Sequence, residues 1–273
     1  MTQFSSTTNT TDIPDILAKI VERRAEHMRI ARGKETFTEP PRTAAVQTPG
    51  NNRFLAALHA QRGSAVIAEV KMGSPSLGSL EGKFEPLDQA RRYAEGGAAA
   101  LSVVVEPEFF HGSYELLAAC SEASGLPAVA KDFVVDPLQL RWAKRAGAHA
   151  VLLIAALYSP AELNQYAKLA RRLGLVPLIE THELSDLEKL EGGVWELVGV
   201  NNRDLRTFDV EISTSLALSH MLPPGSMKVA ESGIHSGGDV SLLRGGGFDA
   251  FLIGESLLLC DDPVAKLQEL RGG

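Results

Sequence analysis

From residue 64 onward, short apolar runs alternate with amphipathic segments. The runs lack strict alternation with polar residues, so they are typical of strands that are buried on both faces, as in a parallel sheet. The segments between them show the three- and four-residue apolar spacing of helices, and Gly147, Gly174 and Gly247 stand where such helices would end. The predicted strands are 65–71, 100–106, 127–132, 150–156, 175–180, 197–202, 227–232 and 250–254.

Eight strands that alternate with helices predict eight βα units and a parallel sheet. Such units most simply close into a single (β/α)8 TIM barrel, which commonly uses roughly 250 residues. An open doubly wound sheet is the alternative. That sheet would carry a G-x-G-x-x-G fingerprint after its first strand, whereas residues 71–78 read K-M-G-S-P-S-L-G. We therefore expect an α/β fold with the barrel over residues 64–273.

The segment before the barrel has a helical pattern. Apolar residues between Ile13 and Met28 recur every three or four positions, with Asp12 as a predicted N-cap and Pro14 in the first turn. A second short helix is predicted over 51–60, so residues 12–63 form a helical extension of the barrel, and the polar residues 1–11 are expected to be a disordered tail. Because an amphipathic face must be buried, we expect residues 12–32 to pack over the barrel mouth.

The composition argues against some binding partners and indicates the cellular compartment of the protein. The net charge is −7 and no Lys/Arg-rich block occurs, which argues against nucleic-acid binding. The longest uninterrupted apolar run, 150–158, has nine residues, whereas a membrane span needs roughly 18. The N-terminus lacks the pattern of a secretory signal, and Cys120 and Cys260 are isolated from one another, as in a reducing compartment. We expect a cytoplasmic protein without a membrane span.

Charged residues stand at the predicted carboxyl ends of several strands, where barrels of this type place their active sites. Glu69 and Lys71 are two positions apart, so both side chains point into the barrel. Taken alone, they could be a structural ion pair, because a buried charge is costly unless it is paired. Lys131 and Glu180 end two other strands, and four charges of mixed sign that converge on one mouth favour an acid–base site.

Two glycine-containing turns follow the seventh and eighth strands. They are Ser232-Gly233 and Gly254-Glu255. Many barrels bind phosphate at this place through backbone N–H groups, and glycine lets the backbone approach a ligand closely. Simple turns remain the alternative for either sequence taken alone, but their joint position favours a phosphate site.

The remaining polar candidates are more ambiguous. Asn201 and Arg203 share a face at the end of the sixth strand, and a guanidinium can bind a carboxylate through two hydrogen bonds. A solvated surface charge is the alternative for Arg203. His149 and His182 flank strands and are expected to be structural. No His or Cys grouping has the spacing of a metal site, so no metal is expected.

Eight stretches of the chain together resemble the indole-3-glycerol-phosphate synthase family of tryptophan biosynthesis. The resemblance runs from about residue 13 to 271 in order and at the family's spacing, and the motifs are very specific in combination. They are I-A-E-V-K-x-G-S-P-S-x-G (67–78), L-S-V-V-V-E-P-E-F-F-H-G-S (101–113), K-D-F-V-V-D-P-x-Q (131–139), A-V-L-L-I-A-A-L (150–157), I-E-T-H (179–182), V-G-V-N-N-R-D-L-x-T-F (198–208), A-E-S-G-I (230–234) and D-A-F-L-I-G-E-S-L (249–257).

The resemblance implies an enzyme that converts 1-(2-carboxyphenylamino)-1-deoxyribulose 5-phosphate into indole-3-glycerol phosphate, with release of CO2 and water. The partner would be this small phosphorylated substrate, and neither cofactor nor metal is implied. We expect a monomer or a weak homodimer.

The resemblance also implies roles for individual residues. Lys131 would be the general acid that protonates the ketone oxygen, with Glu180 as its carboxylate partner, and Glu69 and Lys71 would serve later proton transfers. Lysines crowded in a cationic mouth are expected to have lowered pKa values. The other implied residues are Asn201 and Arg203 to orient the substrate, Phe110 and Phe133 as walls of the aryl pocket, Ser74, Glu231, Ser232 and Leu252 as substrate contacts, and Gly233, Gly254 and Glu255 around the phosphate.

Two other functions fit a phosphate-binding barrel. Phosphoribosylanthranilate isomerase of the same pathway needs a Cys/Asp acid–base pair at strand ends, and neither Cys120 nor Cys260 ends a predicted strand. A non-catalytic barrel that senses a phosphorylated metabolite would be favoured by loss of Lys131 or Glu180, and both residues are present. The synthase function is therefore the preferred prediction.

Overall fold

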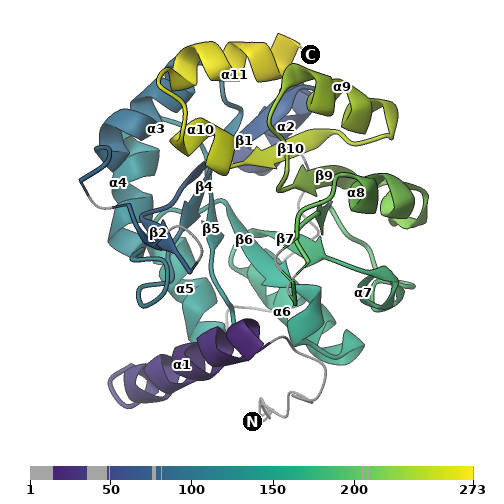
Figure 1. Ribbon diagram of the computed structural model, residues 1–273. Coiled ribbons are helices and arrows are strands. Elements are labelled where there is room, and N and C mark those ends of the chain that lie inside the picture. Colours follow the sequence, from purple (N-terminus) through teal and green to yellow (C-terminus); the bar gives the residue numbers. More distant parts are fainter. Residues whose placement is uncertain are drawn as a thin grey trace.

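A computed structural model describes residues 15–35, 48, 50–75, 78–80, 82–204, 206–207 and 209–272 (Figure 1). The predicted tail, Asp12 and Pro14 lie outside these ranges. Eight parallel strands close into a barrel in the order β1-β10-β9-β8-β7-β6-β5-β4. The strands are β1 (Ala65–Val70), β4 (Ala100–Val104), β5 (Ala128–Lys131), β6 (Ala150–Ile154), β7 (Val176–Thr181), β8 (Leu197–Asn201), β9 (Met227–Glu231) and β10 (Ala250–Ile253).

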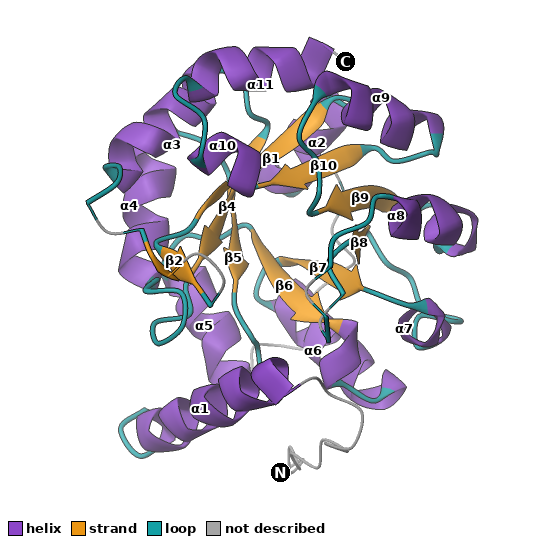
Figure 2. Ribbon diagram, viewed as in Figure 1, coloured by secondary structure: helices purple, strands orange, loops and turns teal. Residues whose placement is uncertain are grey.

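The strands form a central ring with helices outside it (Figure 2). This is the expected (β/α)8 barrel, and each predicted strand lies within two residues of an observed one. The helices are α1 (Asp15–Arg32), α2 (Arg53–Ala60), α3 (Pro86–Glu95), α4 (Tyr114–Ser124), α5 (Pro137–Arg145), α6 (Pro160–Arg172), α7 (Leu184–Glu188), α8 (Ser213–Leu218), α9 (Gly237–Gly245), α10 (Glu255–Leu258) and α11 (Pro263–Gly272), with short 3-10 helices at Ala155–Leu157 and Ser219–Met221.

Local sequence explains where the longer helices begin and end. A capping box starts α5 at Asp136, α6 at Ser159 and α9 at Ser236, because each side chain accepts a hydrogen bond from a backbone N–H of the first turn. The glycines at the predicted helix ends, Gly147 and Gly174 among them, lie one residue beyond the cap with positive φ, which is the conformation that glycine adopts without strain.

The amino end of the barrel is closed by α2. Its Phe54, Leu55 and Leu58 are buried against β1 and β4. Asn52 caps this helix, and its side-chain amide also donates to the carbonyl of His149 at the start of β6. The polar groups of this end are therefore tied to the backbone, while the carboxyl end of the barrel is left open.

Helix α1 packs near the carboxyl end, as expected for the described part of residues 12–32. Leu17, Ile20 and Met28 are buried. Arg24 forms a buried bidentate pair with Asp132, just after β5, with N···O distances of 2.9 and 2.6 Å. Because Asp132 follows the last residue of a barrel strand, this pair attaches the helix directly to the rim of the site.

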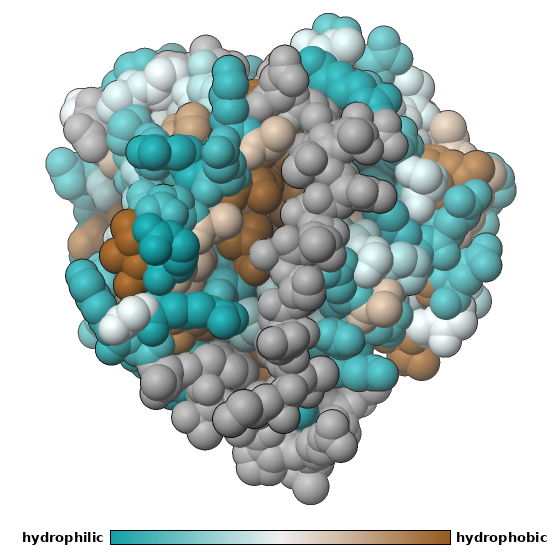
Figure 3. All heavy atoms as spheres, turned by 90° about the horizontal axis from the view of Figure 1, so that it is seen from below, coloured by the Kyte–Doolittle hydropathy of each residue, from teal (hydrophilic) through white to brown (hydrophobic). Residues whose placement is uncertain are grey.

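A small antiparallel hairpin, β2 (Gly73–Ser74) and β3 (Gly78–Ser79), was not predicted from the sequence. The segment reads as a loop because each strand has only two residues. On the face shown in Figure 3, most of the coloured surface is hydrophilic, with hydrophobic residues exposed in several places. None of the helices in the described ranges has the length and apolar character that crossing a membrane requires.

Candidate active site

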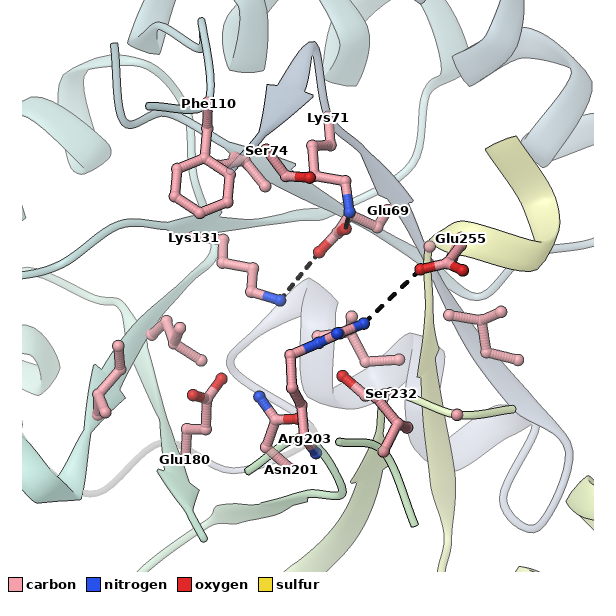
Figure 4. A pocket seen from close by; sticks show the side chains of 18 of the residues that line it. Glu69, Lys71, Ser74, Phe110, Lys131, Glu180, Asn201, Arg203, Ser232 and Glu255 are labelled. Carbon is pink, nitrogen blue, oxygen red and sulfur yellow. Dashed lines mark hydrogen bonds and ion pairs between the residues drawn. The ribbon is translucent and has the colours of Figure 1, made fainter. Parts of the chain in front are cut away.

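A cavity of about 360 Å³ opens at the carboxyl ends of the strands. All of the predicted site residues except Glu231 line it. They come from β1, β5, β7, β8 and β10, from the loops after these strands and from the loops after β4 and β9, and Figure 4 shows labelled side chains converging on one space. Residues that are far apart in the sequence therefore share one site because the barrel closes.

Glu69 lies between the two lysines of the site. Its Oε2 accepts a hydrogen bond from Lys131 Nζ at 2.9 Å, and Lys71 Nζ lies 3.2 Å from its Oε1 (Figure 4). The arrangement corrects one predicted pairing, because the carboxylate in contact with Lys131 is Glu69 rather than Glu180. Gly254 makes room for it, since a Cβ at that position would lie 2.5 Å from Glu69 Oε1.

Lysines crowded together in a cationic mouth are expected from the sequence, but the structure places glutamates around Lys131. Burial disfavours the charged form of both Lys131 and Glu69, but attraction within the cluster outweighs it. Glu69, Glu180 and Glu231 together raise the pKa of Lys131 above its usual value. Lys131 and Lys71 lower the pKa of Glu69 to about 2. The predicted lowering of the pKa of Lys131 is wrong, because three glutamates surround the ammonium group.

Glu180 stands at the end of β7 on another wall of the cavity. Hydrogen bonding from the Asn201 amide and the charges of His182 and Lys131 lower its pKa despite its burial. Asn201 is oriented for this contact because its Oδ1 accepts a hydrogen bond from the backbone N–H of Arg203 at 3.0 Å. The side chain of Asn201 thus links the sixth and fifth predicted strand ends.

Glu231 is fully buried below the cavity rather than lining it. Its Oε1 would be only 2.1 Å from a Cβ at Gly199, and Gly199 is the residue of β8 that pairs with Glu180. The missing side chain therefore lets Glu231 reach Glu180 across β8. Burial and the Glu180 charge raise the pKa of Glu231 well above its usual value. Its predicted contact with substrate stays a prediction.

Two turns, Ser232-Gly233 and Gly254-Glu255, form another side of the cavity, and the first has unusual backbone geometry. Ser232 and Gly233 have φ of +65° and +74°, and the carbonyl of Ser232 accepts a hydrogen bond from Asn202 Nδ2 at 3.0 Å. Arg203 reaches across to Glu255, with 3.6 Å between the guanidinium and the carboxylate (Figure 4). These turns are the ones that the sequence indicates for phosphate.

An aromatic pair forms a further wall. The rings of Phe110 and Phe133 are 5.8 Å apart between centroids and tilted by 33°. Buried Glu106 positions Phe110, because its carboxylate accepts hydrogen bonds from the backbone N–H groups of residues 108, 109 and 110. Asp132, which accepts a hydrogen bond from the Tyr114 hydroxyl at 2.7 Å, fixes the backbone next to Phe133.

Several residues of the cavity were not predicted. They are His235 and a set of apolar residues, of which most belong to α1 and β6. The apolar residues are Ile16, Leu17, Ile20, Leu152, Ile154, Val210, Ile234 and Ile253. The amphipathic pattern of residues 12–32 pointed to α1, but not to which of its side chains reach the cavity. Across the described residues, no group of three or more His, Cys, Asp or Glu side chains is arranged to hold a metal ion.

The chain is similar to proteins of one family over almost its whole length. A family model described as "Indole-3-glycerol phosphate synthase" matches residues 17–270. An indole-3-glycerol phosphate synthase of Koribacter versatilis is 43% identical over 229 residues, which are 84% of this chain and 88% of that protein. A second, from Bordetella pertussis, is 40% identical over 94% of this chain and 98% of that protein.

Solved structures with the same fold are more distant in sequence. A thiamine phosphate pyrophosphorylase from Pyrococcus furiosus matches with a TM-score of 0.56 and 15% identity, covering 78% of this chain and 96% of that one. A chain of the tryptophan synthase complex from the same organism matches with a TM-score of 0.57 and 13% identity, covering 77% and 98%. At these identities the two matches support the barrel fold alone.

Proposed function

The chain belongs to the indole-3-glycerol phosphate synthase family, and we propose that it closes the indole ring of 1-(2-carboxyphenylamino)-1-deoxyribulose 5-phosphate, with loss of CO2 and water. It is a carbon–carbon lyase in this proposal. The observation that carries the proposal is the ion-paired cluster of Lys131, Glu69 and Lys71 at the cavity wall, with ionised Glu180 on another wall. Ring closure, decarboxylation and dehydration need acids and bases on both sides of one substrate.

The first step forms a carbon–carbon bond. The aryl carbon that bears the carboxylate attacks the ketone carbon, and the ketone oxygen takes a proton. Lys131 is the proposed donor, because its raised pKa keeps the ammonium protonated at neutral pH. Glu69 holds this ammonium at 2.9 Å and fixes its position. The positive charge also stabilises negative charge that develops on the oxygen.

The later steps release CO2 and then water. Breaking the bond to the carboxylate returns its electron pair to the ring, which restores aromaticity. Dehydration then needs an acid that protonates the departing hydroxyl and a base that takes a proton from the new ring. Lys71 and Lys131 are the available acids beside Glu69, and Glu180 is the proposed base because its pKa is lowered.

The substrate has an aryl end and a phosphate end, and the cavity offers a different wall for each. Phe110 and Phe133 suit a planar aryl group, and they lie beside Lys71 and Lys131 in the cavity. The turns at Gly233 and Gly254 are proposed to bind the phosphate through backbone N–H groups. The ribulose chain would then pass between Lys131 and Glu180.

The test uses the purified protein and the proposed substrate. Indole fluorescence should appear, and one CO2 should be released for each indole formed. The same assay with phosphoribosylanthranilate should give no turnover. Binding of the carboxyphenylamino substrate without fluorescence or CO2 would support a non-catalytic sensor and contradict the proposal.

A further inference from the structure

His182 lies behind Glu180, on the side away from the substrate cavity. It follows β7, and its ring lines a separate polar cavity of about 420 Å³ beside the active site. Its Nε2 is 3.3 Å from Glu180 Oε1, and its Nδ1 is 3.8 Å from Asp186 Oδ2. The imidazole therefore lies between two carboxylates and does not line the cavity in which we place the substrate.

Asp186 is itself fixed by its own contacts. Its Oδ2 accepts a hydrogen bond from the backbone N–H of His182 at 3.0 Å, and its Oδ1 accepts one from Lys189 Nζ at 3.1 Å. Lys189 also donates to the carbonyl of Ala155 at 3.0 Å. This chain of contacts connects α7 to the loop after β6, so the imidazole has a rigid partner on its outer side.

The charged groups that face His182 are mostly acidic. Glu180 comes from β7, Asp186 from α7, Glu231 from β9 and Asp204 from the loop after β8. The cations around it are Lys189, which pairs with Asp186, and Arg203 and Arg206, which line the same polar cavity as His182. Hydrogen bonding and charge from Asp186 and Glu180 outweigh burial and raise the pKa of His182 to about 9, so the ring is an imidazolium at neutral pH.

Glu180 and Glu231 compete for one proton. They meet across Gly199, and neither Glu231 oxygen has a hydrogen-bond donor among the described residues. Two carboxylates in contact away from water repel one another unless one of them is protonated. The cation of His182 is in contact with Glu180, so Glu231 retains the proton and Glu180 the charge.

We propose that His182 is a positioning residue, whose imidazolium, lying between Asp186 and Glu180, fixes the carboxylate of Glu180 in its ionised form at the cavity wall. This inference rests on the proposed function, in which Glu180 accepts a proton during dehydration. It adds a residue outside the cavity to the groups that determine the rate. The sequence alone indicated only a structural histidine at this place.

The first test replaces the imidazolium with a neutral side chain. In His182→Asn the proton should move onto Glu180 more readily, so the acidic limb of kcat/KM should move up by about one pH unit or more. At neutral pH kcat should fall about tenfold or more while KM changes little. Asp186→Asn should shift the limb in the same direction by a smaller amount. His149→Asn, the same substitution at the amino end of the barrel, is the matched control and should keep the wild-type profile.

The second test needs no variant. Nitrogen NMR of the wild-type protein with labelled histidine should show the His182 ring charged at pH 7 and titrating near pH 9. A ring that is neutral at pH 7 would overturn the proposal, and so would a folded His182→Asn with an unshifted acidic limb. If His182→Asn does not fold, Asp186→Asn and the NMR titration decide. If the wild-type protein is inactive but His182 is charged, the proposed function is contradicted, whereas the contact of His182 with Glu180 is not.

Discussion

The polar side chains at the two ends of the barrel differ in how they are paired. At the amino end, Arg171 pairs with Glu196 at 2.8 Å and donates to the carbonyl of Val194, while Arg62 pairs with Asp249. At the carboxyl end, Glu69 is shared by two lysines, and Glu180 and Glu231 lie in contact with one another. Arg171 and Arg62 at the closed end are each paired with a carboxylate, whereas the charged groups of the open end hold charge that a substrate can use.

This difference separates stability from turnover. Removing a group at the amino end leaves an unpaired partner but touches nothing near the substrate. Removing a group at the carboxyl end changes which proton is available in the cavity. Substitutions at the amino end should therefore lower stability and spare turnover, whereas those at the carboxyl end should lower turnover, and the following variants test that difference.

The largest effect is expected for Lys131→Met. It removes the proposed general acid and should lower kcat by about 10²–10⁴-fold. Methionine keeps the apolar stem of Lys131 and Lys71 still pairs with Glu69, so the variant should fold, with a midpoint of thermal unfolding lowered only by the loss of the Lys131–Glu69 pair. Indole fluorescence and a thermal melt measure both properties. Lys228→Met at the amino end is the control and should keep the rate, and a Lys131→Met rate above roughly a tenth of wild type would exclude the general-acid role.

Arg171→Met is the counterpart at the amino end. It removes the buried ion pair of Arg171 with Glu196, and the loss of one partner of a buried pair costs about 3–5 kcal/mol of unfolding free energy. It also removes the contact of the guanidinium with the Trp195 ring, whose centroid is 5.7 Å away. Urea unfolding should show the loss, while kcat and KM of the folded protein stay at wild-type values. A folded variant with a much lower kcat would show that the two ends are not separate.

Lowering the pH should remove a contribution that the carboxyl end makes to the free energy of unfolding. The pKa of Glu69 is lowered from 4.5 to about 2, so its stabilisation is present above pH 4.5 and is lost as pH falls toward 2. The full contribution is on the order of 3 kcal/mol. Urea unfolding at pH 7 and pH 3 should therefore show a smaller difference in Glu69→Gln than in wild type. Equal differences in the two proteins would mean that Glu69 is not ionised by its lysines.

The smallest effect concerns the phosphate turn. In Gly233→Val the new Cβ would lie 2.6 Å from Val210 Cγ1 at a φ of +74°, so the backbone must move. We expect KM to rise about tenfold with a smaller change in kcat. Gly247→Val at the amino end is strained to a similar degree, with a φ of +92°, but should leave KM unchanged. Inorganic phosphate should inhibit wild type competitively and Gly233→Val more weakly, and equal inhibition would place the phosphate elsewhere.

Much of this fold can be predicted from the sequence, because strands that are buried on both faces appear as apolar runs with clear ends. The two-residue spacing of Glu69 and Lys71 was enough to place both side chains inside the barrel. The pairing of charges was not accessible in the same way. One strand separates β5 from β1 and one strand separates β5 from β7, so strand order alone does not say whether Lys131 contacts Glu69 or Glu180.

Two further features depend on contacts that no local pattern encodes. Glu231 reaches Glu180 because Gly199 lies between them in the strand register. In the sequence, His182 is a polar residue that follows a strand. Its proposed positioning role depends on Glu180 on one side and Asp186 on the other. The Arg24–Asp132 pair that anchors α1 joins residues 108 positions apart. The Glu231 and Arg24 contacts join residues that are far apart in the chain, whereas the partners of His182 are close in the chain and their effect depends on the burial of Glu180.

The most direct test of the account is a crystal structure with the product indole-3-glycerol phosphate bound. The account predicts phosphate oxygens about 3 Å from backbone nitrogens of Gly233 and of the Gly254–Glu255 turn. It predicts the indole ring beside Phe110 and Phe133, with Lys131 and Glu180 on opposite sides of the ligand. A phosphate bound beside Phe110, or a ligand outside the cavity, would contradict it.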